Sequence, residues 1–221
     1  MTDPQGALVL DFGGVISRTM FETHEHSERA LGLAPGSLTW RGPFDPAGDP
    51  LWRAMQADEI SERDYWLTRT QEVGALVGAE WTLMQEFVIA ARGAEASEIL
   101  RPEALAAMKT VKASGLKLAV LSNELDLFYG ADFRHGLPFW DDLDVVVDAT
   151  YTRILKPDPR AYEDCIIQLG LAPADCVFVD DQARNIAGAE RVGMQTVHFD
   201  VTNPGASYAR ALDLLGVSAI A

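Results

Sequence analysis

Five short segments, four of them largely apolar, are separated by longer stretches of helical character and constrain the fold of this 221-residue chain more than any other feature. They are residues 7–10, 117–121, 144–147, 176–179 and 195–198. Strands that are apolar along their whole length are buried on both faces, and their alternation with helices is typical of a parallel sheet covered on each side. The expected intervening helices are residues 102–114, 124–133, 159–169, 183–192 and 205–215. The pattern therefore predicts an α/β fold.

A helical block separates the first expected strand from the second. Its amphipathic stretches are residues 20–31, 50–58, 62–76 and 80–91. Ser61 and Asp64 form the pattern of a capping box at the start of the third stretch, and residues 32–49, rich in glycine and proline, are expected to form a loop. Because the block interrupts the sheet after its first strand, we interpret residues 15–96 as an inserted helical cap. Residues 1–14 and 97–221 would then form the α/β core.

The charge balance limits the partners of the chain. The net charge is -15, from 33 acidic and 18 basic residues, and such a protein repels nucleic acids and anionic lipids. We therefore expect no nucleic-acid partner and no membrane partner. A site for an anionic substrate would have to supply positive charge locally, from a metal ion or a well-placed lysine.

The N-terminal residues and the two cysteines predict the cellular location. The first residues lack the basic region of a signal peptide, and the apolar run 7–10 is too short for a membrane span. Cys165 and Cys176 both lie in apolar surroundings, which is typical of buried, reduced thiols. These features predict a cytoplasmic protein.

Polar residues stand at or after the ends of three expected strands. Ligands of an open parallel sheet bind beyond the carboxyl ends of its strands, so we expect these side chains to meet at one edge, together with a lysine from a nearby loop. The candidates are Asp11, Ser122, Asn123, Lys156, Asp180 and Asp181. Taken singly, such residues can simply be turn or cap residues. The adjacent acids Asp180 and Asp181 repel each other unless a cation joins them, and magnesium is a usual partner of carboxylates and phosphate.

Four segments carry a resemblance to a known family. They are residues 8–16, 120–123, 155–162 and 177–189. Together, and in this order, they resemble the four motifs of the haloacid dehalogenase superfamily, in its branch with a helical cap after the first strand. In detail the pattern is similar to bacterial sugar-phosphate phosphatases and to the amino-terminal phosphatase domain of soluble epoxide hydrolases. The resemblance implies a Rossmann-like parallel sheet of strand order 3-2-1-4-5.

The resemblance also implies an activity and a role for each catalytic candidate. The chain would be a phosphatase of a small phosphorylated metabolite, acting through an aspartyl-phosphate on Asp11. Ser122 and the backbone at Asn123 would hold the phosphoryl oxygens, and Lys156 would neutralise charge on the nucleophile and the phosphoryl group. The oligomeric state stays open between monomer and homodimer.

A magnesium ion completes the implied site. Asp181, helped by Asp180, would bind Mg²⁺ together with Asp11 and the backbone carbonyl of Gly13. Phosphoryl transfer depends mainly on in-line positioning and on charge neutralisation. In a chain of charge -15, the ion and Lys156 would supply the positive charge that the rest of the protein lacks.

Gly13 departs from the family pattern. Most phosphatases of this kind have a second aspartate there, which protonates the leaving group and later activates water. Without it, the leaving group must depart unaided, or a water or another acid must help. Candidate acids from the start of the helical block are Glu22, His24, Glu25 and His26, which could instead lie on a solvated helix face.

Two other functions remain open on the sequence. Haloacid dehalogenases also lack the second aspartate and use an arginine from near the start of the cap, where Arg41 lies, but the acids Asp180 and Asp181 would repel their substrate carboxylate and departing halide. A binding protein that has lost turnover is the third possibility. Aromatic residues of the helical block could either select the substrate or form the core of the cap. They are Trp40, Trp52, Tyr65, Trp66 and Trp81.

Overall fold

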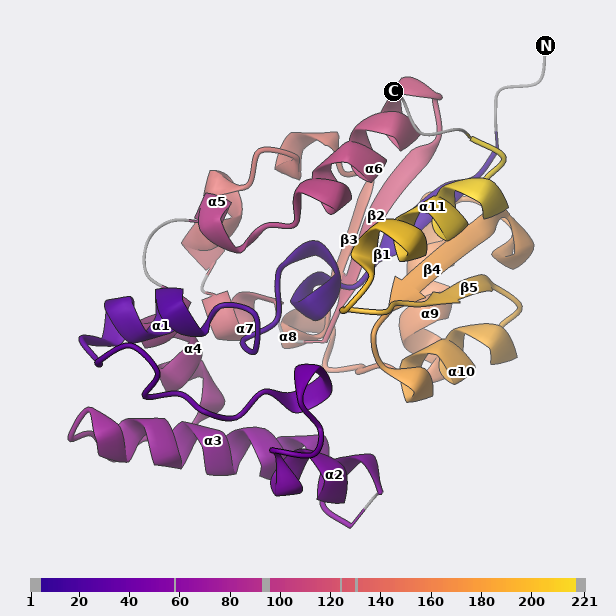
Figure 1. Ribbon diagram of the computed structural model, residues 1–221. Helices are drawn as coiled ribbons and strands as arrows, with labels where there is room; N and C mark the ends of the chain where they lie inside the picture. Colours follow the sequence, from indigo (N-terminus) through magenta and orange to yellow (C-terminus); the bar gives the residue numbers. More distant parts are fainter. Residues whose placement is uncertain (1–4, 58, 93–95, 124, 130, 218–221) are drawn as a thin grey trace. The chain divides into compact units, whose positions relative to one another are not determined.

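The computed structural model describes residues 5–57, 59–92, 96–123, 125–129 and 131–217. Its strands form one five-stranded sheet (Figure 1). The strands are β1 (Ala7–Leu10), β2 (Lys117–Ser122), β3 (Val145–Asp148), β4 (Cys176–Asp180) and β5 (Gln195–His198). All pairings are parallel and the order is β3-β2-β1-β4-β5. The predicted fold class and strand order are confirmed.

The bounds of β2, β3 and β4 differ by one residue from the expected ones, and the differences bear on the site. Ser122 and Asp180 are the last residues of β2 and β4, so the sheet pairing itself fixes their backbones. Asp144 lies just before β3, because its carboxylate accepts a hydrogen bond from the backbone N–H of Leu118 (2.7 Å).

The described chain divides into two compact units. One, called here the sheet unit, comprises Met1–Arg18, Leu100–Asp126 and Asp132–Ala221. The other, called here the helical unit, comprises Thr19–Ile99 and the short segment Leu127–Ala131, which the sequence did not suggest. That the helical unit acts as a cap stays a prediction.

Helices cover both faces of the sheet. α6 (Pro102–Ala113) and α11 (Pro204–Leu214) pack together on one face, and α9 (Pro159–Leu169) and α10 (Ala183–Arg191) on the other (Figure 1). Local chemistry sets their ends: for α9, the Asp158 carboxylate accepts a hydrogen bond from the N–H of Arg160, and Gly170 terminates the helix with a φ of 66°.

The segment after β2 forms less helix than expected. Residues 124–133 were predicted as one helix, but the structure has α7 (Leu125–Tyr129) and then a 3₁₀ segment, Ala131–Gly136. The Asp126 carboxylate pairs with the Arg134 side chain and accepts from the Tyr151 hydroxyl, contacts that a straight helix through residue 133 would not provide. The remaining short elements are α8 (Ala149–Thr152) and the 3₁₀ turns Trp140–Asp142 and Pro173–Asp175.

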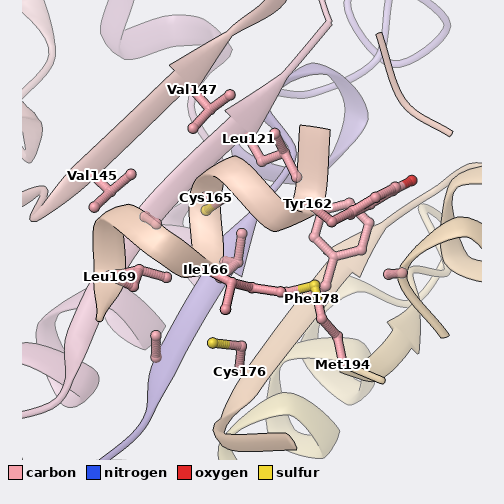
Figure 2. Packing of buried hydrophobic residues seen from close by; sticks show 14 of the residues in the cluster. Leu121, Val145, Val147, Tyr162, Cys165, Ile166, Leu169, Cys176, Phe178 and Met194 are labelled. Carbon is pink, nitrogen blue, oxygen red and sulfur yellow. The ribbon is translucent and has the colours of Figure 1, made fainter. Parts of the chain in front are cut away.

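One hydrophobic core cluster of the sheet unit lies between the sheet and the helices α9 and α10. Figure 2 shows Tyr162, Cys165 and Leu169 of α9 against residues of the strands, among them Phe178 of β4. Cys165 and Cys176 are both fully buried, as predicted. Burial raises the pKa of the Cys165 thiol to about 12 and that of Cys176 to about 11, so neither forms a reactive thiolate near neutral pH.

In the segment Thr19–Ile99 of the helical unit, the described residues form five helices. They are α1 (His24–Leu31), α2 (Pro50–Gln56), α3 (Glu62–Leu76), α4 (Met84–Arg92) and α5 (Ala96–Ile99), with a 3₁₀ turn at Gly42–Phe44. The predicted capping box is present, since Ser61 Oγ accepts from the N–H of Asp64 (3.1 Å) and the Asp64 carboxylate accepts from the N–H of Ser61 (3.1 Å). α1 begins later than expected, because Glu22 accepts hydrogen bonds from both the N–H and the hydroxyl of Thr19 and forms a turn there.

The aromatic residues of this unit form its core. Phe21 packs edge-on against Trp40 (5.5 Å between ring centroids) and Trp52 (5.2 Å). Trp40 and Tyr65 are buried, and Trp66 packs beside them. Their role as core residues is thus the one that the structure shows. No helix in the described part of the chain is long and apolar enough to cross a membrane.

Candidate active site

Three carboxylates meet where β1 and β4 end. Leu10 of β1 pairs with Val179 of β4, and the N–H of Asp11 donates to the carbonyl of Val179 (3.0 Å). This register brings Asp11 beside Asp180 and Asp181, and one oxygen from each carboxylate lies within 4.8 Å of the others. Asp180 is fully buried, whereas Asp11 and Asp181 are partly exposed. The cluster therefore has a closed side at Asp180 and an open side at the other two acids.

Lys156 joins two of these acids. Its Nζ lies 2.7 Å from Oδ1 of Asp11 and 2.7 Å from Oδ2 of Asp180, and its side chain is 1% exposed. The side chain of Asn123 positions the lysine backbone: Asn123 Oδ1 accepts from the N–H of Lys156 (2.7 Å), and Asn123 Nδ2 donates to its carbonyl (3.2 Å). Asn123, the residue after β2, thus fixes the backbone from which the Lys156 side chain extends.

The Asp180 carboxylate accepts hydrogen bonds from Lys156 and from two residues that follow it in the chain. Asn185 Nδ2 donates to both carboxylate oxygens of Asp180, at 3.1 and 3.0 Å, and the N–H of Gln182 donates to Oδ1 (2.8 Å). With Lys156 on Oδ2, protein donors occupy both oxygens. Asp180 is therefore a positioning residue in this geometry, and the two partly exposed acids are the better metal ligands. Sequence reasoning missed Asn185, whose signal was its place in the first turn of the helix after Asp180.

Burial and neighbouring charge set the ionisation of the cluster. Burial raises the pKa of Asp11 to about 6; the Lys156 ammonium opposes that rise and the Asp180 carboxylate adds to it. For Lys156, burial favours the neutral amine, but Asp11 and Asp180 outweigh it and raise the pKa above its ordinary value. The ammonium is thus charged at all physiological pH values. The three carboxylates offer hard oxygen ligands close together, and such ligands fit a divalent cation.

The other candidates of the sheet unit lie on the same edge of the sheet. Ser122 is buried at the end of β2, in register with Asp148 of β3. Gly13 lies in the turn Phe12–Ile16, with φ -69° and ψ 127°, and no heavy atom lies within 4 Å of the position that a Cβ would take. The backbone of residue 13 would therefore accept an aspartate without strain, and its Cβ would meet no clash.

The acids and bases considered as substitutes for the missing aspartate all belong to the helical unit, where most have local roles. Glu22 accepts from Thr19, and His26 pairs with Glu98. His24 is buried edge-on against Trp40, and burial lowers its pKa to about 4. Glu25 and Arg41 are exposed. His24 is therefore a neutral core residue near neutral pH.

The sheet and its edge define a Rossmann-like enzyme built around acidic residues and a buried lysine. The sequence profile described as "haloacid dehalogenase-like hydrolase" matches residues 6–193. The chain belongs to this hydrolase family.

Known proteins of two activities are similar to this chain. A phosphatase of Mycobacterium tuberculosis (strain CDC 1551 / Oshkosh) is 30% identical over 146 residues, which are 66% of this chain and 64% of the phosphatase. An (S)-2-haloacid dehalogenase of Pseudomonas sp. (strain CBS-3) is 27% identical over 170 residues, 73% of this chain and 74% of the dehalogenase. The chain spans less than two thirds of the length of the first curated relatives that it matches.

A solved structure shares the fold. The HAD phosphatase from Thermococcus onnurineus superposes with a TM-score of 0.55 at 18% identity, over 97% of this chain and 100% of the phosphatase. At this identity the similarity concerns the fold, and the activity must be argued from the site.

Proposed function

We propose that this hydrolase is a magnesium-dependent phosphatase that acts on a small phosphorylated metabolite through an aspartyl-phosphate on Asp11. The observation that supports this proposal is the position of the Lys156 ammonium, 2.7 Å from both Asp11 and Asp180, with the Asp181 carboxylate in the same cluster. Substrate phosphate would otherwise meet a chain of net charge -15. Local cationic groups at one carboxylate are what phosphoryl transfer to that carboxylate requires.

Each residue of the cluster has a chemical task in this reaction. An oxygen of the Asp11 carboxylate attacks phosphorus, the bond from phosphorus to the ester oxygen breaks, and the alcohol leaves with a proton taken from water. Water then attacks the aspartyl-phosphate, which releases inorganic phosphate and restores the carboxylate. Lys156 orients Asp11 and offsets charge on the phosphoryl group, while Ser122 and the backbone at Asn123 bind its oxygens. Asp11, Asp181 and the carbonyl of Gly13 would hold Mg²⁺, which supplies further positive charge at the phosphoryl group when bound.

A dehalogenase is the second candidate, favoured by the haloacid dehalogenase relative and by Gly13. The acidic cluster argues against it. The carboxylates of Asp180 and Asp181 would add negative charge beside an anionic substrate carboxylate and a departing halide. Like charges in a partly buried site raise the energy of such a complex.

Two assays on the same preparation distinguish the candidates. Phosphate release from a panel of phosphorylated metabolites is measured with Mg²⁺ and with EDTA, and halide release is measured from short 2-haloacids, with Asp11→Asn as the control. Phosphate release that needs both Mg²⁺ and Asp11 is the expected result. Halide release without metal would establish the dehalogenase, and inactivity in both assays would favour a binding protein that has lost turnover.

The partners and location follow from the same charge argument and belong to the proposal. The substrate is a small molecule, a chain of charge -15 avoids nucleic acid and anionic membranes, and the cytoplasm is the expected compartment.

A further inference from the structure

The turn that follows the nucleophile has little regular structure of its own. Residues Phe12–Ile16 form one wide turn, closed by a hydrogen bond from the N–H of Ser17 to the carbonyl of Phe12 (2.9 Å). Gly13 and Gly14 have non-helical backbone angles inside it, and Gly14 has a φ of 77°. Two consecutive glycines give this segment more backbone freedom than any other pair of residue types. Contacts from outside the turn must therefore fix its position.

Arg101 provides two of these contacts. Its Nε donates to the carbonyl of Gly14 (3.0 Å), and its backbone N–H donates to the carbonyl of Ile16 (2.9 Å). Arg101 is 2% exposed, and its guanidinium lies over the ring of Phe199, 5.5 Å from the centroid. Next to it, Leu100 forms an antiparallel bridge with Ser17. Arg101 therefore fixes the carbonyls of two residues of the turn.

Tyr208 provides the third contact. Its hydroxyl donates to the carbonyl of Val15 (3.1 Å) from α11. The residue is 3% exposed, and its ring packs edge-on against Phe199 (5.2 Å between centroids). The carbonyls of three successive residues, 14 to 16, are thus held by donors from two segments remote in sequence. The neighbouring carbonyl of Gly13 is the one proposed as a metal ligand.

We infer that Arg101 and Tyr208 are positioning residues that hold the turn after Asp11, and so set the direction of the Gly13 carbonyl toward the metal site. This inference rests on the proposed function. Both side chains bind carbonyl groups of the turn itself, so each acts on the metal site through the turn. A residue that merely satisfied a buried carbonyl would affect stability but not metal affinity.

Tyr208→Phe is the sharpest test, because it removes one hydroxyl and keeps the ring against Phe199. Arg101→Lys is a second variant, which keeps the charge and loses the Nε–H donor. Ser207→Ala is the matched control: Ser207 is also buried on α11, and its hydroxyl accepts from the N–H of Asp200 (3.0 Å), but it has no described contact with the turn. Two measurements are made on each protein without substrate. Calorimetry gives the Mg²⁺ affinity, and hydrogen exchange gives the protection of peptides covering residues 12–17.

We expect both variants to weaken Mg²⁺ binding by about tenfold, as loss of an outer-shell partner does, and to lose protection in the turn, while Ser207→Ala changes neither. Unchanged protection in Tyr208→Phe and Arg101→Lys would overturn the inference. Reduced protection with unchanged Mg²⁺ affinity would also overturn the inference, because the contacts of Arg101 and Tyr208 with the turn would then be purely structural. If Arg101→Lys does not fold, Tyr208→Phe decides alone. Failure of the proposed function looks different: the unaltered protein itself would bind no Mg²⁺ and release no phosphate.

Discussion

Nζ of Lys156 lies 2.7 Å from Oδ1 of Asp11, and the side chain of the lysine is almost completely removed from solvent. A buried ammonium at this distance favours the ionised form of the carboxylate, which is the form that can attack phosphorus. Burial acts in the other direction and raises the pKa of Asp11. Burial and the Lys156 ammonium thus act in opposite directions on the pKa of Asp11.

The first prediction concerns the nucleophile. Asp11→Asn should lower phosphate release on the order of 10³-fold or more, as removal of a covalent nucleophile does in other hydrolases. The fold should persist, because asparagine is of similar size and the backbone bond from the N–H of Asp11 to Val179 remains. Turnover and circular dichroism are measured on the same sample. Full activity in the variant would remove the proposed mechanism.

The second prediction separates the two adjacent acids. Asp180→Asn should destabilise the protein by about 3 kcal/mol, because it removes a buried carboxylate that binds both Lys156 and Asn185. Asp181→Asn should change stability little and weaken Mg²⁺ binding at least about tenfold. Urea unfolding in EDTA and calorimetric Mg²⁺ titration measure the two effects. The same stability loss in both variants would contradict the assignment of Asp180 as the positioning residue.

The third prediction concerns the missing acid. Gly13→Asp should fit the structure, since the residue has a φ of -69° and no heavy atom lies near its Cβ position. A general acid contributes about 10²–10⁴ in rate, and it matters most when the leaving group is a poor one. The variant should therefore raise hydrolysis of alkyl phosphates more than that of aryl phosphates. Gly13→Asn is the control of equal size, and a uniform drop across the ester series in Gly13→Asp would count against the argument.

The fourth prediction is a pH dependence of the helical unit. Burial, helped by the positive charge of Arg41 and opposed by Glu28, lowers the pKa of His24 from 6.5 to about 4. In the unfolded chain the imidazole takes up its proton near pH 6.5, so between pH 6.5 and 4 the unfolded state binds more protons. Stability is complete above pH 6.5 and should fall on the order of 2–3 kcal/mol as the pH drops to 4.

His24→Phe should remove that part of the acid sensitivity, because phenylalanine packs against Trp40 and does not titrate. Tryptophan fluorescence measures the unfolding of the helical unit as the pH falls, since four of the five tryptophans lie in this unit, at positions 40, 52, 66 and 81. His135→Gln, at an exposed histidine of the sheet unit, serves as the control. Parallel losses of stability in His24→Phe and in the unaltered chain would show that another group titrates.

Local sequence features determined the elements of this fold. Apolar runs such as residues 7–10 and 176–179 predicted strands, and the capping box at Ser61 and the glycine at 170 predicted helix ends, because periodicity and capping act over one or two turns of chain. The polar residues at the strand ends and in a nearby loop supplied the candidates Asp11, Lys156 and Asp180, and the resemblance of the four motifs supplied the strand order and the role of each candidate. Helix bounds were less predictable where a side-chain hydrogen bond lay close to a helix end, as for Glu22 before α1 and Asp126 in α7.

The sequence by itself thus determined which residue types would stand at the edge of the sheet. The tertiary structure alone decided what holds them: Asn123 on the backbone of Lys156, Asn185 on Asp180, and Arg101 and Tyr208 on the turn after the nucleophile. The last two contacts join residues 87 and 193 positions apart. A hydrogen bond needs its two atoms within about 3 Å of each other and well aligned. For groups so distant in sequence, only the pairing of the strands and the packing of the helices on them can satisfy that condition.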